Sequence, residues 1–236
     1  MKETIDNLDQ VSKKKHYQQL IVLQAIMILL IMIAFQALNE IGIKDINNIL
    51  TPIFGIMGIL LSYVMWSMIR QFTKNPFIII SSLICLFSRF AIAIFINSNL
   101  LESLSEVQKD RLVILSILLS IYGMSVMMLF MIQDIFNEEH EITYRLWGAG
   151  CIYILIGPLF GNVYNLVEIL QPGSIGITGA DMSSKLMHSM THSMYIISSL
   201  DSKYEHVSGL IRNISVIESI FINLYIVLLV GRLLSK

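Results

Sequence analysis

Long apolar runs separated by short polar connections constrain this chain more than any other feature of its sequence. A helix that spans the hydrocarbon core of a bilayer needs about 20 mostly apolar residues, and six runs approach or reach that length. They are Leu20–Leu38, Ile49–Met68, Phe77–Ile96, Leu112–Ile132, Trp147–Ile169 and Val216–Leu234. We therefore predict an all-α membrane fold that crosses the bilayer six times.

The composition agrees with a chain that lies mostly in lipid. Charged residues make up 14% of the sequence and hydrophobic residues 55%, whereas soluble domains carry roughly 25% charged residues. The net charge of −1 argues against a nucleic-acid partner, because binding to phosphates requires a basic surface. No nucleophile–base pair or metal-ligand cluster occurs within the runs, so we expect neither an enzyme nor a bound cofactor or metal.

The charges outside the runs predict the topology. The polar segment 1–19 contains Lys13, Lys14 and Lys15, and positive residues favour the cytoplasmic side of a membrane. We expect a multi-pass protein of the cell membrane with both termini in the cytoplasm. Residues 1–19 form a cytoplasmic segment in this scheme, residues 20–140 a peripheral unit of four helices, and residues 144–236 a second unit.

The connection from Gln171 to Asn213 is the longest in the chain. It opens with a glycine-rich run at residues 172–179, which we interpret as a flexible loop on the outer surface. The following segment, Lys185–Leu200, is semi-polar and too short to span. Such segments are often re-entrant or interfacial helices, so we predict a re-entrant half-helix between the fifth and sixth spans.

The last 90 or so residues carry specific motifs. Residues 211–233 contain an arginine before the helix, an early glutamate, a Leu-Tyr pair and a terminal Val-x-Arg-Leu. Together with His192–Leu200 as a pore helix, these features resemble the two-helix pore domain of prokaryotic potassium channels. The resemblance implies a homo- or hetero-tetramer around a central pathway for monovalent cations.

The sequence differs from that family at the selectivity filter. Asp201-Ser202-Lys203 stands where the family has Gly-Tyr-Gly, and a serine pair precedes it in place of threonines. A potassium filter aims backbone carbonyls at the ion, and glycine permits the left-handed backbone that this needs. The predicted pore and filter residues are Ser198, Ser199, Leu200, Asp201, Ser202 and Lys203.

Two polar residues on the last span are further candidates. Glu218 either braces the pore helix from behind or contacts an ion, and Asn223 either faces the pore or forms a helix–helix hydrogen bond. His188 and His192 stand four residues apart, and we interpret them as one face of an amphipathic helix. The fourth span has no Arg or Lys between Val113 and Gln133, so a voltage sensor is not predicted.

Three functions follow as hypotheses. The first is a cation channel or channel subunit that mediates ion transport across the membrane. The second is a non-conducting pseudo-channel subunit that modifies a partner with an intact filter. The third is a secondary transporter or membrane scaffold, in which the 171–213 connection forms a lid.

Overall fold

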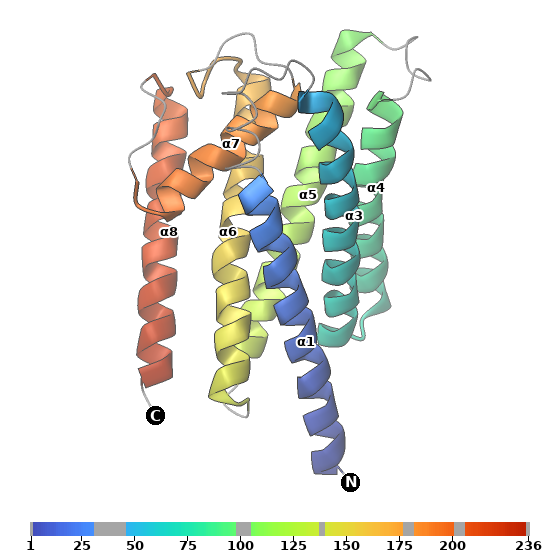
Figure 1. The fold of residues 1–236 in the computed structure, drawn as a ribbon, viewed down its shortest axis with the longest axis vertical. Helices are drawn as coiled ribbons and strands as arrows, with labels where there is room; N and C mark the ends of the chain where they lie inside the picture. Colours follow the sequence, from blue (N-terminus) through green and yellow to red (C-terminus); the bar gives the residue numbers. More distant parts are fainter. Residues whose placement is uncertain are drawn as a thin grey trace.

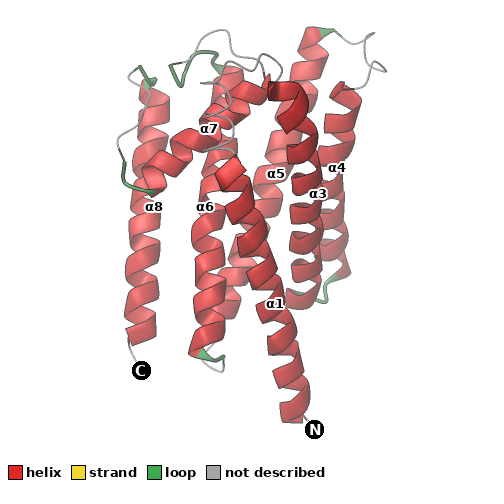
Figure 2. Cartoon of the chain, in the orientation of Figure 1, coloured by secondary structure: helices red, strands yellow, loops and turns green. Residues whose placement is uncertain are grey.

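The computed structural model describes residues 2–30, 46–97, 105–136, 140–176, 182–200 and 206–234. Within these ranges the chain forms seven helices and no strand, which confirms the all-α prediction (Figures 1 and 2). Their bounds are α1 Lys2–Leu29, α3 Ile46–Phe72, α4 Pro76–Asn97, α5 Glu106–Ile135, α6 Ile142–Leu170, α7 Met182–Ile197 and α8 Gly209–Leu234.

Among the described residues, three helices are long and apolar enough to cross a membrane. These are Val107–Ile135 in α5, Ile142–Leu170 in α6 and Gly209–Leu229 in α8. The described parts of α3 and α4 contain shorter apolar stretches, Ile56–Phe72 and Pro76–Ser88. The chain is thus a membrane protein by helix length and composition, and the count of six spans stays a prediction.

The first helix begins well before the first apolar run. The run was predicted from Leu20, but α1 already starts at Lys2 and includes the polar segment. Tyr17 and Leu20 are fully buried, because this part of α1 packs on α3 and α6. The second half of the predicted first run, beyond residue 30, lies outside the described residues.

The turn between α3 and α4 has a sequence reason. Pro76 occupies the first turn of α4, where its missing N–H leaves no hydrogen bond unmade. Asn75 precedes it and accepts a hydrogen bond from the backbone N–H of Phe77 at 3.0 Å. The backbone N–H of Asn75 in turn donates to the hydroxyl of Thr73 at 3.1 Å.

Helix α6 is the centre of the molecule. It contacts α1 and α5 on one side and α7 and α8 on the other (Figure 1). Gly148 permits the first set of contacts, since a Cβ there would lie 2.4 Å from Ile135 and 3.2 Å from Tyr17. The core beside α6 is rich in methionine, whose flexible side chain fills irregular gaps; its members include Met65, Met68, Met127 and Met131.

Candidate functional site

Helix α7 packs closely against the C-terminal half of α6. A Cβ at Gly161 would lie 3.1 Å from the Cα of Met190, and one at Gly157 would lie 2.2 Å from the side chain of Met194. Small residues at such spacing let two helix backbones approach each other in a membrane. The two glycines therefore allow α7 to pack closely on α6.

The order of these contacts shows that α7 runs antiparallel to α6. Met190 lies against Gly161, Met194 against Gly157, and the Tyr153 hydroxyl lies 3.5 Å from the Ile197 carbonyl oxygen. Tyr153 is 17 residues before the end of α6 at Leu170, which is about 25 Å at ~1.5 Å per residue. Helix α7 thus crosses α6 obliquely, and its C-terminal end lies beside the middle of α6 (Figure 1).

The chain is back at the same end of α6 when α8 begins. The backbone N–H of Ser208 donates to the Ser174 carbonyl oxygen at 2.7 Å. Gly176, with a φ of +86°, lies so close to His206 that a Cβ would come 3.1 Å from its carbonyl oxygen. The described residues on the two sides of positions 201–205 thus lie at different levels of α6: the end of α7 is near its middle, and Ser208 is near its C-terminal end.

The described part of the loop after α6, residues 171–176, is held in place by hydrogen bonds. The Glu168 carboxylate accepts hydrogen bonds from the Gly173 N–H at 2.7 Å, the Ser174 hydroxyl at 2.9 Å and the Ile175 N–H at 2.9 Å. Ser174 and Ile175 are buried. This corrects the interpretation of residues 172–176 as a flexible loop, because a single carboxylate satisfies three donors of the turn.

A buried carboxylate joins all three helices of this region. The Ser193 hydroxyl on α7 donates to Glu218 Oε1 and the Tyr164 hydroxyl on α6 donates to Glu218 Oε2, each at 2.5 Å. Glu218 itself belongs to α8 and is fully buried. Ser193 Oγ is also 3.0 Å from the Gly157 carbonyl oxygen. The side chain predicted either to brace α7 or to meet an ion thus lies behind α7, in contact with it.

His192 and Ser215 extend this polar cluster. His192 Nε2 lies 2.9 Å from Ser215 Oγ, and the Ser215 hydroxyl donates to the Ile211 carbonyl oxygen at 2.9 Å. The rings of His192 and Tyr164 meet edge to face with centroids 4.8 Å apart. Within the described ranges no group of three or more His, Cys, Asp and Glu residues is placed to hold a metal ion.

The C-terminal end of α7 is exposed. The helix ends at Ile197, three residues before the predicted end at Leu200, because Ser199 adopts a φ of 54°. The Leu200 N–H then donates to the Tyr195 carbonyl oxygen at 3.0 Å. Ser198, Ser199 and Leu200 are all exposed to the surroundings of this single chain. The other predicted filter residues, Asp201, Ser202 and Lys203, lie outside the described residues.

Helix α8 is held to the rest of the chain along one narrow stripe. Glu218, Ile222 and Tyr225 are buried on that stripe, and the Tyr225 hydroxyl donates to the Ala149 carbonyl oxygen on α6 at 2.8 Å. Asn223 lies off the stripe and is exposed, so its amide faces the surroundings of the single chain. Much of the remaining surface of α8 is apolar and open.

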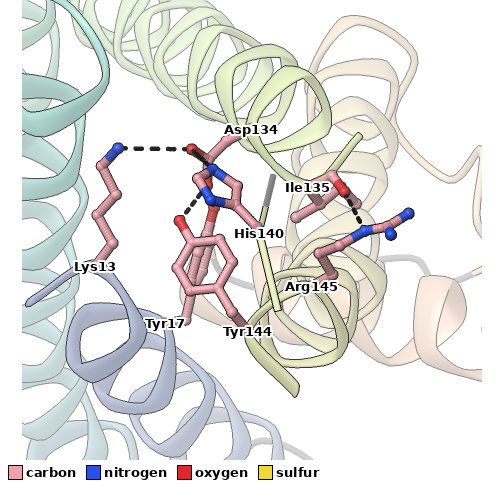
Figure 3. Close-up of polar contacts among 7 residues, drawn as sticks. All are labelled: Lys13, Tyr17, Asp134, Ile135, His140, Tyr144 and Arg145. Atoms are coloured by element: carbon pink, nitrogen blue, oxygen red, sulfur yellow. Dashed lines mark hydrogen bonds and ion pairs between the residues drawn. The ribbon is translucent and has the colours of Figure 1, made fainter. Parts of the chain in front are cut away.

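A second polar cluster lies at the opposite end of α6, and sequence analysis did not predict it. Figure 3 shows its side chains converging on Asp134, at the end of α5. The Tyr17 hydroxyl donates to Asp134 Oδ2 at 2.9 Å, and the Tyr144 hydroxyl donates to the same oxygen. Lys13 Nζ and His140 Nε2 lie 3.6 Å and 3.4 Å from Oδ1.

The Asp134 cluster ties α1, α5 and α6 together. Burial, and then the negative charge of Asp134, raise the pKa of Tyr17, so its hydroxyl keeps the proton that it donates. Beside the cluster, Arg145 Nε donates to the Ile135 carbonyl oxygen at 2.9 Å. An aspartate at the end of an apolar run was the one available signal, but its partners come from two other segments, α1 and residues 140–144.

Comparison with known proteins adds no relative to this description. No protein-family model, curated protein or solved structure matches the chain significantly. The resemblance to potassium channels thus rests on the motifs of residues 147–233 alone.

Proposed function

We propose that this chain is a subunit of a cation-channel-like membrane protein in which α6, α7 and α8 form the pore unit. In this proposal the chain crosses the bilayer six times, with both termini in the cytoplasm of a cell. Helix α7 is the re-entrant half-helix, and α1, α3, α4 and α5 form the peripheral unit. Four subunits surround the pathway, because a single α6–α8 unit cannot enclose one.

The observation that carries the proposal is the path of α7. It descends beside α6 to Tyr153 and leads to a segment that is back at the end of α6 by Ser208. Backbone that is not helical is tolerated at membrane depth only where it is buried in protein or lines a water-filled cavity. The end of α7 is exposed in a single chain, so a ring of subunits with a central cavity accounts for its position.

The polarity of α7 suits a cation. Its C-terminal end is exposed beside the middle of α6, and the last carbonyls of a helix carry a partial negative charge. Ser198 to Lys203 follow directly and would line the entrance to the pathway. Farther along, Asn223 on the open side of α8 offers an uncharged polar group to a hydrated ion.

The remaining contacts support a rigid pore unit. Glu218 holds α7 from behind through Ser193, which favours bracing over ion contact for this carboxylate. The open apolar surface of α8, with Val216, Ile220 and Val227 more than half exposed, is suited to lipid and neighbouring subunits.

Cation flux through liposomes tests the proposal. We would reconstitute the purified chain alone and measure monovalent-cation flux for the wild type and for Asp201→Asn, with Asp110→Asn on α5 as the matched control. We expect flux from the wild type and the control, and a change in rate or selectivity for Asp201→Asn. Chemical cross-linking of the same samples should give bands up to a tetramer.

The other outcomes separate the alternatives. A tetramer without flux would support a non-conducting pseudo-channel subunit, which the Asp-Ser-Lys sequence in place of Gly-Tyr-Gly favours. A folded monomer without flux would overturn the pore unit and leave a transporter or scaffold as the better hypothesis.

A further inference from the structure

One surface of the peripheral unit combines apolar stripes with cations at one end. On α1 the side chains of Val22, Ile26 and Leu29 are exposed by 56, 42 and 55%. Residues spaced by seven lie on the same side of a helix, and Lys15, also exposed, precedes Val22 by seven residues. The outer side of α1 is therefore apolar along two turns and ends in an ammonium group.

Helix α3 repeats this arrangement. Ile56 and Tyr63 are exposed by 61 and 56%, and Arg70, the next residue at the same spacing, is exposed as well. The Arg70 guanidinium lies over the Trp66 ring, 4.9 Å from its centroid, and the rings of Tyr63 and Trp66 are 6.4 Å apart. Aromatic rings of this kind are enriched where hydrocarbon gives way to headgroups.

The two cationic ends lie at the same level of the bundle. His16, next to Lys15, has one ring nitrogen 3.2 Å from Ser67 Oγ and the other 3.3 Å from Gln71 Nε2. These two residues flank Arg70 on α3. Lys74, in the turn after α3, adds a third exposed cation close to this level. Lys13 differs from all three because Asp134 binds it.

The stretches of α1 and α3 that carry this face have no acidic residue of their own, since Glu3, Asp6 and Asp9 all precede Lys13. Residues 13–30 and 56–88 contain no aspartate or glutamate. The beginning of α5, at the opposite end of the bundle, carries Lys109 and Arg111 on either side of Asp110. An excess of Lys and Arg beside an apolar surface attracts the anionic headgroups of a membrane leaflet.

We propose that the α1–α3 face binds an anionic phospholipid. Lys15, Arg70 and Lys74 hold its phosphate, and its acyl chains lie along the apolar stripes of the two helices. The cations match the charge of the headgroup, and the stripes match the length and chemistry of the chains. This inference requires that the chain is inserted in a membrane, but it does not depend on ion conduction.

Tryptophan quenching gives a local test, because the sequence has two tryptophans. In a Trp147→Phe background, Trp66 beside Arg70 is the single tryptophan, and it can be excited selectively over the tyrosines. The full chain is reconstituted in phosphatidylcholine vesicles that contain the same minor fraction of brominated phosphatidylglycerol or brominated phosphatidylcholine. We expect the anionic lipid to bind more strongly, by roughly fivefold for each cation that contacts the headgroup, measured as the ratio of the two quenching curves.

The variants decide the assignment. Replacing Lys15, Arg70 and Lys74 by glutamine should bring the ratio close to one, whereas Lys109→Gln with Arg111→Gln should leave it unchanged. Because the ratio compares two lipids within one variant, a changed Trp66 environment does not affect it, and circular dichroism verifies the fold. Equal quenching in the parent protein, or an unchanged ratio in the triple variant, would overturn the proposal. Loss of the lipid preference on addition of inorganic phosphate at matched ionic strength would also overturn the proposal, because the site would then recognise a soluble anion.

Discussion

The two polar clusters on α6 each hold a carboxylate between three helices, but the carboxylates have different partners. At the C-terminal half, Glu218 accepts its hydrogen bonds from the uncharged hydroxyls of Tyr164 and Ser193. Near the N-terminal end, Asp134 accepts from Tyr17 and Tyr144 but also lies close to Lys13 and His140. Each carboxylate joins three helices, but only the second does so with ion pairs.

Their positions explain the difference. Glu218 is fully buried in a helix apolar enough to span a membrane, where a cation would add its own desolvation cost. Asp134 lies at the end of its helix and its side chain is 9% exposed, so long basic side chains reach it while keeping contact with water. Helix α6 is thus anchored by hydrogen bonds at one end and by a mixed ionic cluster at the other.

Removing the Glu218 carboxylate should have the largest effect on the stability of the fold. Glu218→Leu removes the charged acceptor that two buried hydroxyls share, and leaves them the uncharged Gly157 carbonyl oxygen and Ser215 Oγ; each loss costs about 1–3 kcal/mol. We expect the free energy of unfolding to fall by about 3 kcal/mol, measured by denaturant titration in detergent micelles. Glu218→Gln keeps one acceptor oxygen and should lose less, and the exposed Asn223→Leu should change little. Equal stability of the Leu and Gln variants would contradict the bracing role.

Adding a methyl group at the contact between α6 and α7 should have the next largest effect on stability. A methyl group at Gly161 would meet Met190, including its backbone, so Gly161→Ala should destabilise the fold by about 1–3 kcal/mol. Gly231→Ala is the matched control, since nothing lies within 4 Å of a Cβ there. Proteolysis of the segment between α7 and α8 would report whether α7 has moved. Similar stability of the two variants would exclude close packing of α7 on α6.

Neutralising Asp134 should have a smaller effect. Asp134→Asn keeps an oxygen for the tyrosines but removes the attraction to Lys13 and His140, which we expect to lower stability by about 1.5 kcal/mol. Asp110→Asn, at an exposed position, should stay within about 0.5 kcal/mol of the parent. The same denaturant titration measures both. If Asp134→Asn leaves the free energy of unfolding unchanged, the tyrosine hydroxyls alone hold this end of α6.

The smallest expected quantity is the coupling between the clusters. Tyr144 and Tyr164 are 20 residues apart on α6, or about 30 Å. Distant sites without shared partners usually add within about 0.5 kcal/mol, so Glu218→Leu and Asp134→Asn should be additive in a double-mutant cycle. A larger coupling energy would show that α6 transmits a change from one cluster to the other.

Sequence analysis located the elements better than the contacts between them. The predicted run Leu112–Ile132 lies within α5, and Trp147–Ile169 lies within α6. Glu218 was singled out because a carboxylate within an apolar run needs a partner, but Ser193 and Tyr164 could not be named as its partners. Asp134 was missed, since its partner Tyr17 lies 117 residues away.

The sequence alone predicts the all-helical, membrane-suited character of this protein and the approximate positions of helices such as α5 and α6. Both follow from the length of the apolar runs and from local signals such as Asn75-Pro76, which act within a few residues. Only the tertiary structure decided that α6 is the central helix, that α7 descends beside Gly157 and Gly161, and that two carboxylates anchor the bundle. In a chain whose helices are nearly all apolar, hydrophobicity does not distinguish one neighbour from another. Small residues and single polar contacts make that choice, and they act between segments far apart in sequence.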